Sequence, residues 1–143
     1  MDSRIKIGFR FENSDGESEI ETMWVKESVD GYVIDNIPFY ATELALGDIV
    51  AAMPEVDGLL VFTKLVRPSR HSTVRLLFQD VKNVAPIREQ LRKMGCHSEL
   101  SDLPILVAVD IPPEIDFQVV KSFFDSGEKS GIFEYEEACL GFL

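Results

Sequence analysis

The stretch RPSRHSTVRLLF, residues 67–78, separates two different patterns of predicted secondary structure. Short alternating segments joined by tight turns precede it, whereas helical periodicity alternates with strands after it. The two halves join at Pro68-Ser69 without a Gly/Ser-rich linker, so we expect them to pack together rather than move independently. The sequence therefore predicts a module of residues 1–70 and a module of residues 71–143.

The first half is predicted to consist of short strands. Residues 5–11, IKIGFRF, place apolar side chains on one face and polar or small ones on the other, which is typical of a half-buried strand. Further strands are predicted over residues 20–27, 32–39, 49–53 and 59–66, with turns at Asp15-Gly16 and Asp30-Gly31. The strand over 32–39 should end or bulge at Pro38. This pattern predicts a small N-terminal β-barrel-like module.

The second half alternates strands with helices. Residues 72–79, 97–100, 104–111 and 132–137 are predicted strands, and Val84, Ile87, Leu91 and Met94 mark one face of a helix. A second helix is expected to open at Pro112-Pro113-Glu114 and to end near Gly127. The order β-α-β-β-α-β predicts a ferredoxin-like C-terminal module and an α+β fold class. Because the central strands have two apolar faces and the helices cover one, the other face should pack on the first module.

Composition restricts the classes of function. The chain has 143 residues, 45% of them hydrophobic, and a formal net charge of −11. A protein with this net negative charge repels phosphate backbones. We therefore expect no nucleic-acid partner and favour a partner protein with a basic face. No secretory signal, membrane-length apolar run, P-loop, GxGxxG or CxxC is present, and there are two cysteines. We expect a cytoplasmic protein without a cofactor.

The quoted stretch is the centre of a cationic interval. No acidic residue occurs from Gly58 through Gln79. Guanidinium and hydroxyl groups make directional bonds to phosphate or carboxylate, so this interval could bind an anion. Alternatively, its arginines pair with the surplus carboxylates, for instance Glu134 and Glu136 on the closing strand. The candidate anion-binding residues are Arg67, Arg70, His71, Ser72 and Arg75.

Both histidines should lie near one aspartate. In a ferredoxin-like sheet the starts of the strands over 72–79 and 97–100 lie beside the end of the strand over 104–111. This places His71 and His97 on either side of Asp110, a plausible metal-binding group, with His71 and Asp110 a plausible acid–base pair. The alternative is that one or both histidines point into solvent while Asp110 begins the turn before Pro112.

The cysteines and three of the aromatic residues can be explained by packing alone. Cys96 and Cys139 should lie near opposite edges of the second sheet, too far apart for a disulfide, as ordinary buried thiols. Trp24, Phe39 and Tyr40 could line a pocket between the modules, or they could fill the core.

Four short motifs are spread over most of the chain: Asn36-Ile37-Pro38-Phe39, Leu46-Gly47-Asp48-Ile49-Val50, His71-Ser72-Thr73 and Phe133-Glu134-Tyr135-Glu136. In this order along the chain they resemble an uncharacterised bacterial family, domain of unknown function 4265. The resemblance implies a bacterial, cytoplasmic origin and brings no activity, cofactor or site residue.

Two classes of function follow. The first is a non-enzymatic acidic binding or regulatory protein, such as an inhibitor or immunity-type partner of a basic protein. The second is a small-molecule or metal-dependent enzyme, or a ligand-binding protein, that uses His71, Asp110 and His97. Convergence of those three side chains on one open pocket would favour the second class, and their divergence would favour the first.

Overall fold

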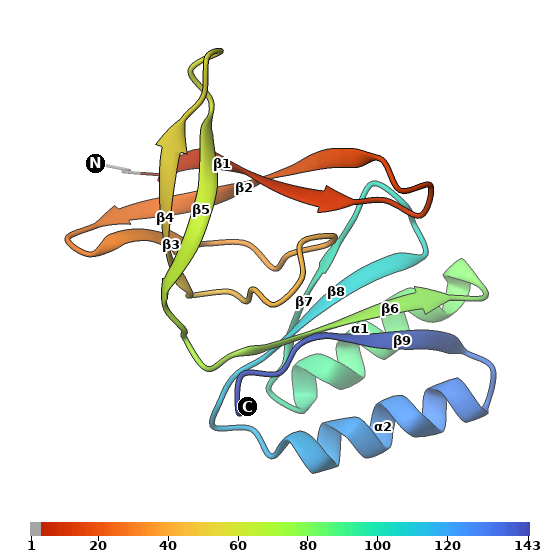
Figure 1. The fold of residues 1–143 in the computed structure, drawn as a ribbon. Coiled ribbons are helices and arrows are strands. Elements are labelled where there is room, and N and C mark those ends of the chain that lie inside the picture. Colours follow the sequence, from red (N-terminus) through yellow and green to blue (C-terminus); the bar gives the residue numbers. More distant parts are fainter. Residues whose placement is uncertain (1–3) are drawn as a thin grey trace.

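The computed structural model describes residues 4–143, which form two mostly antiparallel sheets and two helices in a mixed α+β fold (Figure 1). The first sheet contains β1 (Arg4–Glu12), β2 (Ser18–Ser28), β3 (Gly31–Ile34), β4 (Ile49–Pro54) and β5 (Leu60–Arg67). The second contains β6 (Ser72–Phe78), β7 (His97–Leu100), β8 (Leu106–Ile111) and β9 (Phe133–Cys139). The helical segments are η1 (Val81–Asn83), α1 (Val84–Lys93) and α2 (Phe117–Lys129).

The first sheet closes on itself as a ring. Consecutive strands from β1 to β5 pair antiparallel, and β5 returns to β1 through a parallel pairing at Gly8 and Val61. Its interior is filled by alternate side chains of the strands and by two residues of the segment between β3 and β4. The buried residues are Ile7, Phe9, Met23, Val25, Ile34, Ala41, Leu44 and Val50.

The third strand is shorter than predicted, because it ends at Ile34 and not near Pro38. The side-chain carbonyl of Asn36 accepts the N–H of Trp24 at 2.5 Å, so a side chain takes the donor that a longer strand would have bonded. The chain then runs without regular structure from residue 35 to residue 48, here called the junction loop. It turns at Gly47, whose φ is +86°, into β4, where the predicted strand over 49–53 is confirmed.

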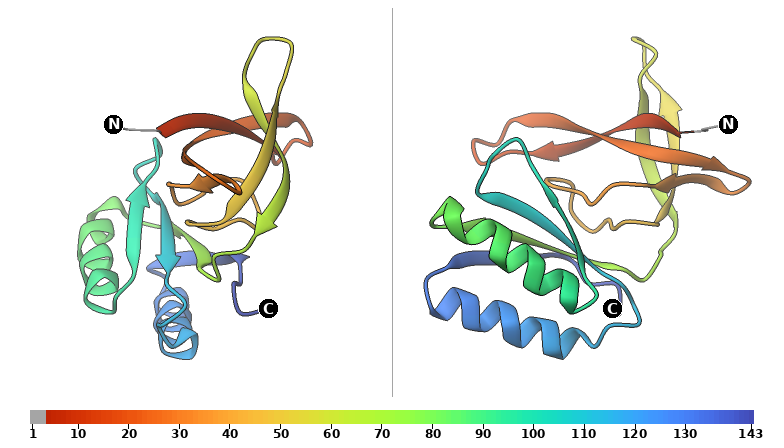
Figure 2. Two further views of the ribbon diagram at one scale, coloured as in Figure 1. Left: turned by 90° about the vertical axis from the view of Figure 1, so that its left-hand side faces the viewer. Right: turned by 180° about the vertical axis from the view of Figure 1, so that it is seen from behind.

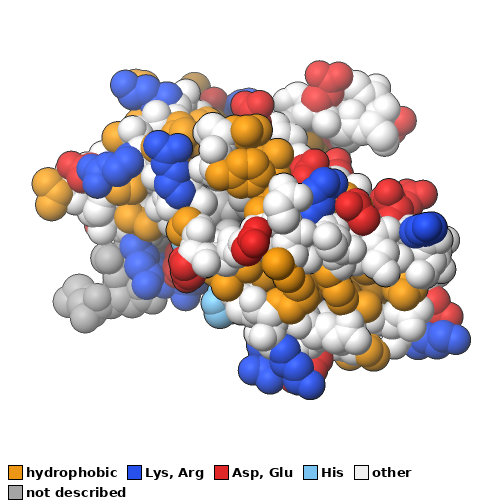
Figure 3. Space-filling model, turned by 90° about the horizontal axis from the view of Figure 1, so that it is seen from below, with side chains coloured by type: hydrophobic (Ala, Val, Ile, Leu, Met, Phe, Trp, Pro, Cys, Tyr) orange, Lys and Arg blue, Asp and Glu red, His pale blue; other side chains and the backbone are white. Residues whose placement is uncertain are grey.

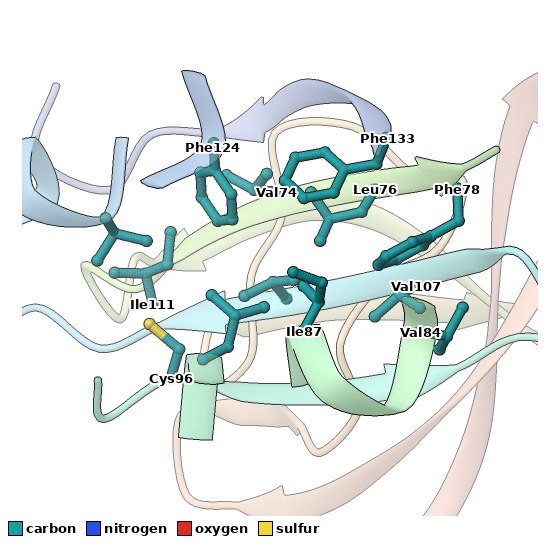
Figure 4. Packing of buried hydrophobic residues seen from close by; sticks show 13 residues of the cluster. Val74, Leu76, Phe78, Val84, Ile87, Cys96, Val107, Ile111, Phe124 and Phe133 are labelled. Carbon is teal, nitrogen blue, oxygen red and sulfur yellow. The ribbon is translucent and has the colours of Figure 1, made fainter. Parts of the chain in front are cut away.

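In the second sheet the strand order is β7-β8-β6-β9, and all three pairings are antiparallel. Both helices cover the face that points away from the first sheet (Figures 1 and 2). Neither helix is long and apolar enough to span a membrane within the described range. Aromatic and aliphatic side chains fill the space between helices and sheet, as Figure 4 shows for Val74, Leu76, Phe124 and Phe133, among others.

The second helix begins later than predicted, whereas its end lies near Gly127 as predicted. It begins at Phe117 and not at Pro112-Pro113-Glu114, because Asp116 is the N-cap and its side chain accepts the N–H of Gln118 at 3.0 Å. It continues through Gly127 to Lys129. A Cβ on Gly127 would lie 2.2 Å from the ring of Phe133, so this glycine permits a close approach and does not end the helix.

We expect Gly127→Ala to destabilise the fold, although alanine favours helices. The buried ring of Phe133 leaves no room for the methyl group, and overpacking of this kind costs about 1–3 kcal/mol of unfolding free energy. Urea denaturation followed by circular dichroism measures the loss. The neighbouring Ser126→Ala is the control, because Ser126 is exposed. Equal stability of the two variants would contradict the close approach.

Candidate functional site

The face of the second sheet that meets the first sheet is only partly apolar, so the prediction of two apolar faces is correct only in part: Thr73 and Arg75 share this face with the buried Ala108. Thr73 and Arg75 on β6 are buried, at 0% and 7% exposure. Thr73 Oγ1 donates to the carbonyl of Leu44 at 3.0 Å, and the guanidinium of Arg75 donates to the carbonyl of Ala41. The junction loop is not in a sheet, and its buried carbonyls need donors from elsewhere. The polar residues of β6 supply them.

Two carboxylates hold the N–H groups of the same loop. The Asp48 side chain is buried and accepts the N–H of Ala45 at 2.9 Å and that of Ser69 at 2.7 Å. It thereby ties the loop to the connection between β5 and β6. Glu21 on β2 accepts the N–H groups of the three consecutive residues 39–41, at 2.7, 3.0 and 2.9 Å. No sequence pattern predicts the Glu21 contacts, because the residues involved are about twenty positions apart.

His71 and Asp110 are brought together. The Nδ1 atom of His71 lies 2.8 Å from Oδ1 and 3.1 Å from Oδ2 of Asp110. The aspartate is fully buried, whereas the histidine side chain is 26% exposed. Burial raises the pKa of the Asp110 carboxyl, and the hydrogen bond and charge of His71 offset part of that rise. The contact between the carboxylate and Nδ1 fixes the orientation of the imidazole ring, and Nε2 then points away from the buried carboxylate. A histidine oriented in this way is suited to bind a ligand or transfer a proton through Nε2.

His97 does not complete a metal site. It lies opposite Asp110 in the pairing of β7 with β8, as predicted. Its side chain is exposed on an edge strand, and it lines a separate hollow next to Arg88 and Arg92. Both oxygens of Asp110 are already within 3.1 Å of His71. Within residues 4–143 no three His, Cys, Asp or Glu side chains are grouped as metal ligands would be.

The proposed anion-binding side chains are not gathered at one place. Arg67 pairs with Asp30 at 2.5 Å, and Arg75 lies 3.4 Å from Glu136, the carboxylate named above as an alternative partner. Ser72 and His71 are adjacent in the chain. The Ser72 hydroxyl accepts the N–H of Gly141 at 3.0 Å, so it is engaged away from the imidazole.

Arg70 and His71 do share a hollow of about 440 Å³, here called the His71 hollow. Glu43 and Arg70, the two non-glycine residues with positive φ in the described range, both line it, as does Cys139. Burial, with Asp48 and Glu43 adding to its effect, raises the pKa of Cys139 to about 11. The thiol is therefore protonated at neutral pH and is a poor nucleophile. The described cysteines are both free, as expected.

A second hollow, here called the acidic hollow, has a volume of about 670 Å³. It lies where the turn between β1 and β2, the junction loop, β6, β9 and the segment after β7 meet. Phe11 and Tyr40 stack in it, with ring centroids 5.0 Å apart and an interplanar angle of 13°. Its charged lining residues are Glu12, Glu19, Glu21, Arg75, Asp102 and Glu136.

Sequence reasoning identified only part of this site. Tyr40 was proposed as a pocket residue and does line the acidic hollow, and with Phe39 it also lines a neighbouring one. Trp24 instead lies on the outer face of the first sheet, with Arg4 and Lys6 over its ring at 4.7 and 4.9 Å. The carboxylates come from five separate positions of the chain, which no local motif joins.

Comparison with known proteins places these features in a family. The family profile described as "Domain of unknown function (DUF4265)" matches residues 21–135. The chain belongs to this family. The range that matches the DUF4265 profile includes Asp48, His71 and Asp110, so the junction loop and the His71–Asp110 pair lie within it.

A solved structure shares the whole architecture. The "Novel crystal structure of a hypothetical protein from Neisseria gonorrhoeae" matches with a TM-score of 0.84 and 26% sequence identity. The match covers 100% of this chain and 98% of that one, so both sheets and their arrangement are shared. No curated protein matches the chain significantly in sequence.

We expect the His71–Asp110 pair to contribute to stability as a unit. His71→Ala leaves the buried Asp110 carboxylate without its partner, which costs about 1–3 kcal/mol of unfolding free energy. A double-mutant cycle with Asp110→Ala, measured by urea denaturation at pH 7, tests this. The double variant should lose less unfolding free energy than the sum of the losses of the two single variants, by at least about 1 kcal/mol. Additive losses, within about 0.5 kcal/mol, would contradict a direct interaction.

Proposed function

We propose that this DUF4265 protein is a non-enzymatic binding or regulatory protein, of the inhibitor or immunity type, whose partner is a basic protein. The observation that carries the proposal is an uncompensated acidic surface. The chain has 25 acidic and 14 basic residues, and the acidic hollow is lined by five carboxylates and one guanidinium. Complementary charge speeds encounter and selects partners, so such a surface suits a cationic one.

The basic side chains do little to neutralise the acidic hollow. Seven lysine and arginine side chains form ion pairs within residues 4–143, and only Arg75 lines this hollow. On the face seen from the helix side, basic and acidic side chains are mixed around exposed hydrophobic ones (Figure 3). The ion pairs are Arg4–Asp35, Arg10–Glu55, Arg67–Asp30, Arg75–Glu136, Lys82–Asp80, Arg92–Glu89 and Lys121–Asp125.

A ligand-binding or enzymatic function is the second candidate, with a site at His71, Asp110 and His97. The 2.8 Å contact between His71 and Asp110 favours it, because an imidazole oriented by a buried carboxylate is a common acid–base group. Against it, His71 and His97 line different hollows, and the carboxylate of Asp110 lines neither. This divergence is the outcome that favours the binding protein.

The proposal includes a finer description of the fold and its location. We infer a small barrel-like module over residues 1–70 and a ferredoxin-like module over 71–143. The ring of β1 to β5 supports the first inference, and the strand order β7-β8-β6-β9 supports the second. A bacterial cytoplasmic location is consistent with two free cysteines. We propose no cofactor, no membrane association and no nucleic-acid partner.

A pulldown from the native cytosol, followed by reconstitution with the purified partner, tests the proposal. We expect a protein with a basic surface, and an association rate that falls steeply between about 50 and 300 mM salt, because screening weakens the attraction of exposed charges. Surface plasmon resonance measures the rate. The capture of an acidic protein or a nucleic acid, or a rate that does not depend on salt, would contradict the proposal.

A further inference from the structure

We propose that the acidic hollow binds an arginine or lysine side chain presented by the partner. This assignment rests on the proposed function and adds the place and the chemistry of recognition. The hollow is built from both sheets: Phe11 and Glu19 come from the first, and Arg75 and Glu136 from the second.

The carboxylates of the acidic hollow differ in how far they are already engaged. Glu21 is bonded to three backbone N–H groups, and Glu136 lies 3.4 Å from Arg75. Glu19 accepts only the side-chain amide of Asn13, at 3.0 Å. Glu12 and Asp102 have no hydrogen bond or ion pair to any part of the chain that the structure describes. Three carboxylates are thus available to a cation from outside.

The potential inside the hollow is negative. Burial raises the pKa of the Tyr40 hydroxyl, the charges of Asp102, Glu21 and Glu19 raise it further, and the charge of Arg75, the smallest of these effects, lowers it. The same field that opposes a phenolate favours a cation placed beside it. A metal ion needs ligands that converge on one point, and residues 4–143 contain no such group. An extended organic cation can instead satisfy carboxylates that are spread around a wall.

The aromatic pair gives the hollow a preference for planar cations. Phe11 and Tyr40 are stacked on one another and half-buried, and both line the acidic hollow. A guanidinium or an ammonium over the face of an aromatic ring gains about 0.5–2 kcal/mol, and the planar guanidinium of arginine also stacks parallel to the ring. We therefore expect arginine to bind more tightly than lysine.

Arg75 indicates that the bound group belongs to a peptide. This guanidinium is 7% exposed and lines the acidic hollow, and its buried Nε has no hydrogen-bond partner. A buried donor without an acceptor is costly. A basic residue within a peptide brings its own backbone carbonyls next to its cationic group. We expect one of these carbonyls to accept from the Arg75 Nε in the complex.

The probe for this assignment is acetyl-Gly-Gly-Arg-Gly-Gly-amide, with the corresponding lysine and uncharged citrulline peptides as comparisons. Nuclear magnetic resonance titration of the wild-type chain should shift the backbone signals of Glu19, Tyr40 and Asp102. The arginine peptide should bind most tightly and the citrulline peptide should cause no such shifts. The Glu12→Gln/Asp102→Asn variant should weaken binding of the arginine peptide about tenfold.

A matched variant separates this site from general surface charge. Glu27→Gln/Glu114→Gln removes the same net charge at two exposed positions outside the hollow, and should change affinity less than about twofold. Equal weakening by both variants, or shifts at the His71 hollow, would overturn the assignment but leave a basic partner possible. If the partner from the pulldown is not basic, the proposed function itself fails, whatever the peptide does.

Discussion

The arrangement of the two sheets depends on the buried hydrogen bonds between β6 and the junction loop. Thr73 and Arg75 donate to two loop carbonyls, while Asp48 and Glu21 accept loop N–H groups. The same loop fills the interior of the first sheet with Ala41 and Leu44. Because buried backbone groups are costly unless bonded, the loop is stable only between these partners. Tyr40 is thereby held against Phe11, and Arg75 at the base of the acidic hollow.

This arrangement of the two sheets places Arg75 next to the carboxylates of the acidic hollow. Arg75 is the buried cation of the interface, and burial lowers its pKa while the carboxylates of Glu136 and Glu21 counter that effect. One guanidinium does not balance five carboxylates, so the hollow keeps a negative potential. The His71 hollow has fewer carboxylates, because Glu43, Asp48 and Glu137 line it beside one guanidinium, that of Arg70. Of these carboxylates, Asp48 is already bonded within the fold. We therefore place recognition at the acidic hollow.

Much of the fold could be predicted from periodicity alone. Alternation identified β1 and β2, and the spacing of Val84, Ile87 and Leu91 identified α1, since these residues are buried. The proximity of His71 to Asp110 also followed from the expected strand pairing. The cap at Asp116 was missed because two prolines before it resemble a helix start, although they lie in a turn.

The interface could not be predicted, because its bonds join residues that are distant in sequence and irregular in structure. Thr73 bonds a carbonyl 29 positions away, and Arg75 one 34 positions away. Amphipathic patterns report burial against apolar neighbours, so a buried threonine and arginine within an apolar strand gave no indication of their partners. The carboxylates of the acidic hollow were missed for the same reason, since their grouping depends on how the sheets are joined.

Amide hydrogen exchange tests most directly whether the junction loop is part of the cooperative fold. The amides of Tyr40, Ala41 and Ala45 are bonded to the carboxylates of Glu21 and Asp48. The account predicts that they exchange as slowly as the strand amides of Val74 and Leu76, because they open only when the whole fold opens. Exchange at the rate of an exposed turn such as Gly58 would contradict it, and would mean that this loop does not fix the two sheets.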